Sequence, residues 1–416
     1  MAEEARKESL FQVPNYPAWF GADTALLCGS AVHWIVISLM AYELSGSVTL
    51  AGWFSTSRAV TSMITQIVGG TFVDRHDHRR LLLAQSGICG TLWLIMGLLY
   101  ATGNLTYVRF MVLCLSSSAV FGLLDGTSNA ALITVVGPER YAQAESLNQG
   151  RDAAVRMAGS PLGATLYGLW APAPFFASAF CDIAAFFCSL ALHLPERPEV
   201  KETRPGIGAF LHDLIEGWQW VAASKTIVSA VLIMGLFEFS AWSMRQAINL
   251  QLVSTGTDAL LISLVNVVSG LSTLLGSVFS SRVCDRVPAG KGVMATLAFT
   301  ALGYVPLIFS DAYGTFILNA VLTSLPMPLF GALVNGFVFS KTPVDRQGRT
   351  RAAITTTVMA FGSLSGAMAG ELLPRIGFSG FVSAMLVLAM SSVVLTGINP
   401  RLRTIPSSPH WGEVEL

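Results

Sequence analysis

Five ionisable side chains lie deep inside long apolar stretches of the sequence, and they are the residues best placed to do chemistry. In chain order they are His33, Arg58, Asp125, Asp182 and Glu238. Placing such a group in hydrocarbon costs roughly 2 to 3 kcal/mol, so it tends to face a partner or a water-filled cavity. Carboxylates and imidazoles in these surroundings can take up and release a proton. The sequence therefore predicts proton or ligand binding at these positions.

Two of these residues open the two halves of the chain. His33 lies in the first apolar stretch and Glu238 in the seventh, and we expect them to carry a proton or to contact a ligand. The alternative for His33 is a buried imidazole that donates one structural hydrogen bond. The alternative for Arg58 is a buried ion pair with Asp125 or Asp182, which would only hold helices together.

Aromatic side chains accompany the two leading residues. Trp34 and Phe237 flank them, and Trp242 lies one helical turn beyond Glu238. Such side chains could line a cavity for a lipophilic molecule, although aromatic residues more often face lipid or pack between helices. Adjacent helical residues point about 100° apart, so an ionisable residue and its flanking aromatic cannot both point squarely into one cavity.

The number of long apolar stretches decides the fold class. Hydrophobic residues make up 53% of the 416 residues and charged residues 12%, whereas soluble domains carry charge on roughly a quarter of their residues. A helix of about 20 apolar residues can span a bilayer. The predicted spans lie near residues 19–43, 48–73, 81–102, 107–135, 148–171, 173–193, 226–250, 257–282, 292–310, 313–340, 352–374 and 377–398. We therefore predict an all-α membrane protein with 12 transmembrane helices in two pseudo-symmetric six-helix bundles.

A polar stretch in the middle of the chain sets the predicted domain organisation. The segments are a cytoplasmic N-terminal segment (1–18), an N-terminal bundle (19–193), a linker with an amphipathic helix (194–225), a C-terminal bundle (226–398) and a cytoplasmic tail (399–416). Lys and Arg gather on loops of one parity, which marks the cytoplasmic side of short loops. Both termini are therefore predicted to be cytoplasmic, in a multi-pass protein of the inner membrane.

The sequence contains no P-loop, no HExxH, no GxSxG and no cluster of metal ligands at workable spacing, which are the common signatures of nucleotide, metal and acyl-transfer chemistry. Its formal net charge is zero, so there is no electrostatic reason to expect a nucleic acid partner. We expect no enzymatic activity, no cofactor and no metal, and an ion gradient as the energy source.

Two loops share a small residue, three further residues and then Asp-Arg. They are GTFVDRHDHRR at 70–80 and SRVCDRVPAGK at 281–291, each after the second span of its half. Recurrence at equivalent positions indicates duplication, which is common in transporters built around a midplane site. The residues concerned are Gly70, Asp74, Arg75, Arg79 and Arg80 in the first loop and Asp285 and Arg286 in the second.

The fifth stretch contains AGSPLGATLYG, with Gly159, Pro161 and Gly163. These residues would let neighbouring helices pack tightly and bend. Earlier in the same stretch, Asp152 and Arg156 are four residues apart, a spacing that favours an ion pair on one helix.

In the order and spacing of these motifs, the chain resembles the major facilitator superfamily over nearly its whole length. Three segments, VGPERYAQAESLNQ, FLHDLIEGWQWVAASKTI and PVDRQGRTRA, look like the drug:proton antiporter branch that includes macrolide efflux, Tap-type multidrug efflux and enterobactin exporter proteins. The resemblance implies that the first Asp-Arg loop is a cytoplasmic gating latch, in which the small residue, Gly70, permits a close helix approach. The second loop is then its degenerate copy. The resemblance also implies that the Gly-Pro-rich stretch is the helix motif associated with antiport.

The function that this resemblance implies is secondary active transport. We expect proton-coupled efflux of amphipathic small molecules or drugs by alternating access, carried out by a monomer in the lipid bilayer. One alternative is export of a single native metabolite, such as a siderophore, or transport of a lysolipid. Another is a membrane sensor that transports nothing. A narrow substrate range in transport assays would favour the specific exporter.

Overall fold

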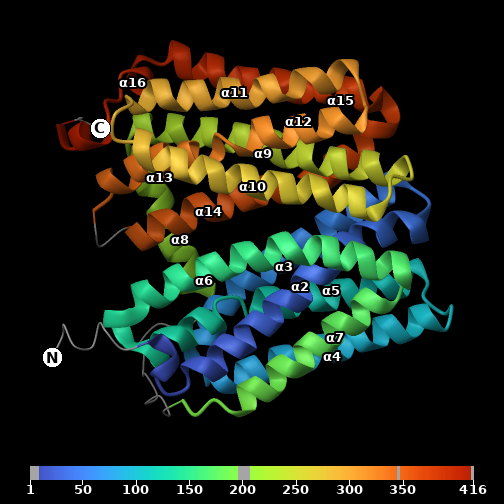
Figure 1. Ribbon diagram of the computed structural model, residues 1–416. Coiled ribbons are helices and arrows are strands. Elements are labelled where there is room, and N and C mark those ends of the chain that lie inside the picture. Colours follow the sequence, from blue (N-terminus) through green and yellow to red (C-terminus); the bar gives the residue numbers. More distant parts are fainter. Residues whose placement is uncertain (1–8, 195–206, 344–346, 414–416) are drawn as a thin grey trace. The chain divides into compact units, whose positions relative to one another are not determined.

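The computed structural model describes residues 9–194, 207–343 and 347–413, and within these ranges all regular structure is helical (Figure 1). A helix satisfies its own backbone hydrogen bonds, which an apolar chain in lipid must do. The first half of the chain contains η1 Leu10–Gln12, α2 Tyr16–Ser45, α3 Val48–Arg75, α4 His78–Ala101, α5 Tyr107–Leu123, α6 Thr127–Leu169 and α7 Ala173–Leu190.

The remaining helices belong to the second half of the chain. They are α8 Ile207–Ala223, α9 Lys225–Ser254, α10 Ala259–Val283, α11 Ala289–Phe309, α12 Tyr313–Ser324, α13 Met327–Lys341, α14 Gln347–Ser363, α15 Ser365–Ile398, α16 Pro400–Arg403 and η3 Ser408–Glu413. By contact clustering, the first unit is Met1–Ser45 with Ser57–Gly208, and the second is Gly46–Thr56 with Ala209–Leu416. The domain boundaries expected from the sequence remain a prediction.

The helices resolve into twelve spans once kinks and breaks are taken into account. Nine segments of the described chain are long and apolar enough to cross a membrane, and the last of them, Gln347–Ile398, has 52 residues. It holds two spans, because Gly377 interrupts α15 with a φ of 70°. Two further helices, which are more polar than these, complete the set of twelve: α3 and the part of α6 after Gly137. The predicted all-α fold of 12 transmembrane helices is therefore confirmed.

One helix begins earlier than its sequence indicated. The fifth predicted span started near residue 148, but α6 resumes directly after Gly137, whose φ of 72° marks the break. Pro138 then occupies the first helical position, where its missing N–H costs nothing. The early turns carry Glu139 and Arg140, so apolarity, the signal used to place the span, is weak exactly where the helix starts.

Small residues bring α6 close to α2 inside the first unit. A Cβ atom added at Gly163 would lie 1.9 Å from the carbonyl oxygen of Val32, and one added at Gly159 would lie 2.4 Å from the Cβ of Ala31. The tight packing expected of the Gly-Pro-rich stretch is therefore present, and its partner is α2. This contact holds the helix that carries His33.

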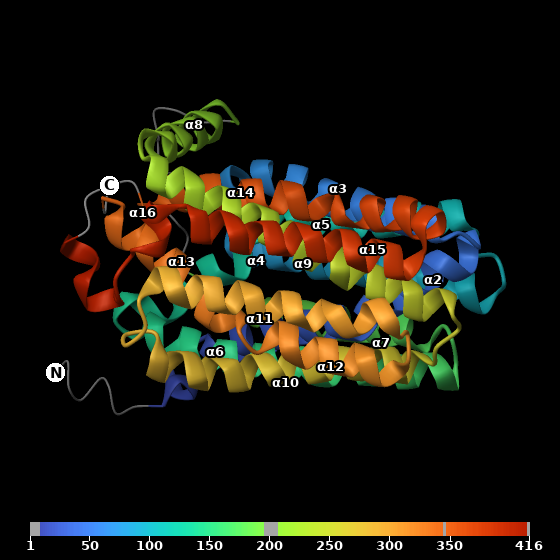
Figure 2. The same cartoon turned by 90° about the horizontal axis from the view of Figure 1, so that it is seen from above.

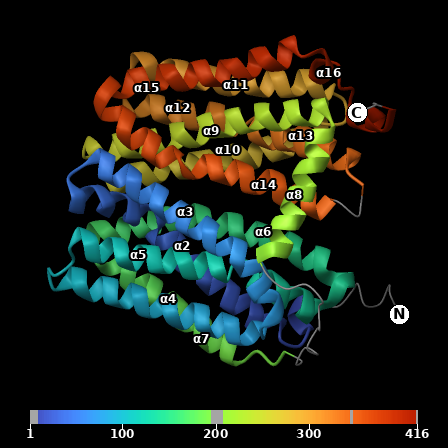
Figure 3. The same ribbon diagram turned by 180° about the vertical axis from the view of Figure 1, so that it is seen from behind.

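Helix α8 differs from the spanning helices of its unit. Figure 3 shows it at a steep angle to α9 and α14, and in Figure 2 it lies beside these helices rather than among them. Its end packs through Val221 against α9 and α14. Glu216 pairs with Arg349 of α14, and Gly217 allows the backbones to approach, since a Cβ there would lie 2.4 Å from the carbonyl oxygen of Arg349.

Candidate functional site

His33 is buried between α2, α4 and α7, with 7% of its surface exposed. Its Nδ1 lies 3.1 Å from the Ser178 hydroxyl, and the ring lies 4.0 Å from the ring of Trp93. The Ser178 hydroxyl has one proton, which main-chain carbonyl oxygens accept, among them that of Gly29 at 2.9 Å. With that proton on a carbonyl oxygen, Nδ1 of His33 donates to the Ser178 hydroxyl, and Nε2 is then the nitrogen that can accept a proton.

The same contacts give His33 the structural hydrogen bond that its alternative interpretation requires. They do not use Nε2. The structural role is therefore filled, and proton uptake by His33 stays a prediction.

Asp182 occupies a niche formed by two glycines. Only 4% of its surface is exposed. A Cβ built at Gly29 of α2 would lie 3.5 Å from Asp182 Oδ1, and one built at Gly90 of α4 would lie 3.2 Å from the Asp182 Cβ. Because Gly29 also accepts the Ser178 hydrogen bond, the structure brings Asp182 and His33 into one cluster around the α2–α7 contact.

Arg58 of α3 meets an aromatic ring and a hydroxyl. Its Nε donates to Ser118 Oγ at 3.2 Å, and its guanidinium carbon lies 5.9 Å from the centre of the Trp34 ring. Trp34 is 61% exposed, and its role in lining a cavity stays a prediction. Asp125, which was expected near the middle of a helix, is exposed at the break between α5 and α6 and accepts a hydrogen bond from Gln66.

In the second unit, three side chains lie along one face of α9. Glu238 faces the Trp242 indole and interacts electrostatically with the positive charge of Arg245. The Arg245 guanidinium carbon lies 5.2 Å from the centre of the Trp242 ring. Spacings of four and three residues place these side chains on one helical face. A carboxylate, an exposed aromatic ring and a guanidinium thus lie together.

Phe237 does not belong to this face. It is 1% exposed and its ring lies 4.9 Å from that of Phe330, in an apolar cluster that also contains Leu333. The expectation that it lines a cavity is therefore wrong. The 100° step between neighbours on a helix turns it into the core when Glu238 faces elsewhere.

The first Asp-Arg loop is held by helix-end contacts. Arg79 donates from Nη2 to the carbonyl oxygen of Leu190, at the end of α7, at 2.8 Å. Asp77 caps α4 by accepting from the backbone N–H of Arg80 at 2.8 Å, a role that an Asp just before an apolar helix could have signalled. Arg75 is exposed, and the side chain of Asp74 lies outside the part of the chain that is described.

The close helix approach near this loop occurs one residue earlier than expected. A Cβ at Gly69 would lie 2.4 Å from the carbonyl oxygen of Leu123. Around Gly70, by contrast, no atom of the described residues lies within 4 Å of such a Cβ. The packing role assigned to Gly70 is therefore wrong, because the face of α3 that meets α5 passes through Gly69.

A charge network between α2 and α6 was missed from the sequence. Arg151 pairs with Asp23 and with Asp152, the latter at 2.7 Å, and donates to Thr24 Oγ1 at 3.0 Å. The spacing indicated a pair between Asp152 and Arg156, but Asp152 pairs with its neighbour Arg151. The partners on α2 are more than 120 residues away in the chain, so no local pattern announces them.

In the second Asp-Arg loop, Asp285 and Arg286 are both exposed. Asp285 accepts a hydrogen bond from the hydroxyl of Ser408 at 2.5 Å. The second loop is thus tied to the C-terminal residues, which the sequence had indicated only as a tail.

Comparisons with known proteins agree with this architecture. A family model described as Major Facilitator Superfamily matches residues 22–367. An uncharacterised MFS-type transporter of Bacillus subtilis (strain 168), YceJ, is 23% identical over 394 residues, which cover 89% of this chain and 92% of that protein.

Two solved structures share the fold. The nucleoside transporter NupG superposes with a TM-score of 0.69 at 12% identity, over 92% of this chain and 97% of that one. The human organic anion transporter MFSD10 (TETRAN) gives a TM-score of 0.63 at 15% identity, over 92% of this chain and all of that one. At these identities the likeness concerns the fold alone.

Proposed function

Since this chain belongs to the Major Facilitator Superfamily and is a membrane transporter, we propose that it exports amphipathic small molecules in exchange for protons. The observation that carries the proposal is a carboxylic acid inside a spanning helix of each unit, Asp182 in α7 and Glu238 in α9. Burying an acid within an apolar span costs free energy. Reversible protonation is a function that would account for its presence there.

Proton binding supports exchange if it changes the affinity for cargo or the preference between two states of the protein. Asp182 lies beside the His33 cluster, and Glu238 lies beside Trp242 and Arg245. Neutralising Glu238 removes a charge beside Trp242, and neutralising Asp182 removes one beside the His33 cluster. We propose that Trp34 and Trp242 contact the apolar part of the cargo and that Arg58 and Arg245 hold these rings in place.

The remaining features of the proposal concern location. We propose that the protein works as a monomer in the cytoplasmic membrane, with both termini in the cytoplasm. The basic loops of one parity support this orientation.

The proposal predicts uphill cargo movement in vesicles that contain only this protein. With an acidic interior and a neutral exterior, protons leave and the vesicles should accumulate ethidium or a macrolide above the level reached without a pH gradient. Glu238→Gln should reduce this accumulation by roughly 5- to 150-fold, the range of a coupling free energy of about 1 to 3 kcal/mol. Uptake is measured by fluorescence or with radiolabelled drug.

Protein-free vesicles are the control, because weak bases collect passively in acidic interiors. Accumulation equal to that of protein-free vesicles, for every amphipathic compound in a panel of cationic dyes, macrolides and neutral drugs, would contradict the proposal.

A further inference from the structure

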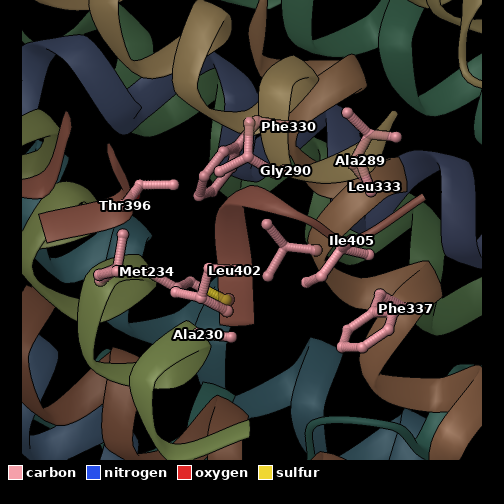
Figure 4. A pocket seen from close by; sticks show the side chains of 13 residues that line it. Ala230, Met234, Ala289, Gly290, Phe330, Leu333, Phe337, Thr396, Leu402 and Ile405 are labelled. Carbon is pink, nitrogen blue, oxygen red and sulfur yellow. The ribbon is translucent and has the colours of Figure 1, made fainter. Parts of the chain in front are cut away.

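The C-terminal segment, Pro400–Trp411, packs into the second unit instead of leaving it. Leu402 and Ile405 are buried in the same apolar cluster as Phe330 and Leu333 of α13. Figure 4 shows Leu402 and Ile405 among the side chains of α9, α11 and α13. The segment therefore contributes to the core at the end of the unit where α11 begins and α13 ends.

The segment also caps α11. The first N–H groups of a helix have no partner within the helix, and Pro288, at the N-cap position of α11, offers no side-chain hydrogen bond. The N–H of Ala289 donates to the carbonyl oxygen of Pro406 at 3.1 Å, and that of Gly290 donates to the carbonyl oxygen of Ile405 at 3.2 Å. Carbonyl groups of the C-terminal segment thus do the work of a capping residue.

Two glycines on different helices shape the seat of the segment. A Cβ at Gly290 of α11 would lie 2.1 Å from the carbonyl oxygen of Leu402. A Cβ at Gly336 of α13 would lie 2.9 Å from the Trp411 ring. The Trp411 ring meets that of Phe337 edge-on at 5.9 Å. The helices therefore carry a site that is fitted to this segment.

The segment closes on the second Asp-Arg loop. Ser408 donates its hydroxyl proton to Asp285 Oδ1, and the Cys284 thiol lies 3.7 Å from the same oxygen. This contact is exposed to solvent, where a single hydrogen bond contributes only about 0.5 to 1.5 kcal/mol. Breaking this contact therefore costs little free energy.

The seat is also incompletely filled. A cavity of about 30 Å³ lies between the segment and the helices. Its lining is almost entirely apolar and includes Ile233, Met234, Leu333, Leu402 and Ile405. Side chains facing such a gap forgo dispersion contacts on one side. The side chains that line the gap therefore lack some of the contacts of a fully packed core.

We propose that Pro400–Trp411 is a dissociable latch, which docks on α11, α13 and the Asp285 loop and leaves this seat when that end of the second unit rearranges. The inference rests on the chain being a transporter, not on its cargo or coupling ion. A latch that is made in one state and broken in another shifts the balance between them by its own binding free energy.

Hydrogen exchange on the purified protein tests the latch without cargo or gradient. In Ser408→Cys, mild oxidation should link the new thiol to native Cys284, since both positions contact Asp285 Oδ1. When the link is reduced, the amides of Ala289 and Gly290 should exchange faster than those in the middle of α11. Once the link forms, exchange at these two amides should slow by roughly tenfold or more. Ser408→Cys combined with Cys284→Ala is the control that cannot link.

Equal exchange at these two amides in the linked and reduced proteins would overturn the proposal, because a permanently docked segment gains nothing from a link. Failure of the link to form would also overturn it, since the docked arrangement requires the two positions to be close.

A second pair of variants displaces the segment without a cross-link. Gly336→Ala places a methyl group against Trp411, whereas Gly331→Ala on the same helix meets no atom of the described residues closer than 3.9 Å. Faster exchange at Ala289 and Gly290 is expected in the first variant only. The same rate in both variants would show that the Trp411 contact does not hold the segment.

Discussion

Asp182→Asn is expected to disconnect transport from the proton gradient while leaving the protein folded. The niche between Gly29 and Gly90 fits the carboxyl group closely, and an amide has almost the same size. An amide cannot take up a proton at physiological pH, so the variant lacks the reversible charge that the proposal requires. Gradient-driven accumulation in vesicles should fall by roughly 5- to 150-fold, as expected for a lost coupling free energy of about 1 to 3 kcal/mol.

Exchange of labelled for unlabelled cargo at equal pH separates a coupling role from a structural one. This exchange needs no net proton movement, so Asp182→Asn should retain it. Asp125→Asn is the matched control, because Asp125 is exposed and paired with Gln66. Equal loss of both activities in Asp182→Asn, or an equal effect of the control, would remove Asp182 from the coupling role.

Gly163→Ala is expected to be the most destabilising single methyl addition in the first unit. The added Cβ would lie 1.9 Å from the carbonyl oxygen of Val32, and a backbone atom cannot turn aside as a side chain can. Helix α6 would have to move away from α2, which carries His33. Overpacking of this kind costs about 1 to 3 kcal/mol, and thermal unfolding of the purified protein in detergent should show a lower midpoint temperature.

Gly168→Ala supplies the control on the same helix. Among the described residues no atom lies within 4 Å of a Cβ at this position, so the variant gains helix propensity, worth up to about 1 kcal/mol, at no steric cost. Its midpoint should be unchanged or raised. If Gly163→Ala unfolds at the same temperature as Gly168→Ala, the α2–α6 contact is not as tight as it appears in the structure.

The fold was largely predictable because apolar length alone reports a spanning helix. The limits of the prediction come from helices that carry charge. Helix α6 begins at Pro138 rather than near residue 148, since residues such as Glu139 and Arg140 hide its first turns from a criterion of apolarity. Helix α3 is also comparatively polar, yet its predicted span, 48–73, agrees with the observed Val48–Arg75.

The site was predictable as a set of residue types but not as a set of contacts. The cost of a charge in lipid singles out His33, Asp182 and Glu238 whatever their neighbours. Which glycine meets a neighbouring helix depends on helix rotation to within one residue, and this explains why Gly69 takes the role expected of Gly70. A sequence pattern gives the spacing of residues along a helix, but it does not determine which neighbouring helix each side chain faces.

Contacts between distant parts of the chain left no trace in the sequence. The network around Arg151 joins α6 to Asp23, and the C-terminal segment reaches Asp285 through Ser408. Each pair is separated by more than 120 residues. Such pairs are created by the packing of helices, and single-sequence patterns describe only neighbours along one helix or loop.

The most direct test of proton exchange is the internal pH of vesicles when only cargo is out of balance. Vesicles containing the protein and a trapped pH-sensitive dye are given external cargo with the same pH inside and outside. Because coupling is reciprocal, inward cargo movement should drive protons out and raise the internal pH, and Asp182→Asn should abolish this rise. Cargo entry through the unaltered protein with no change of internal pH would contradict the account.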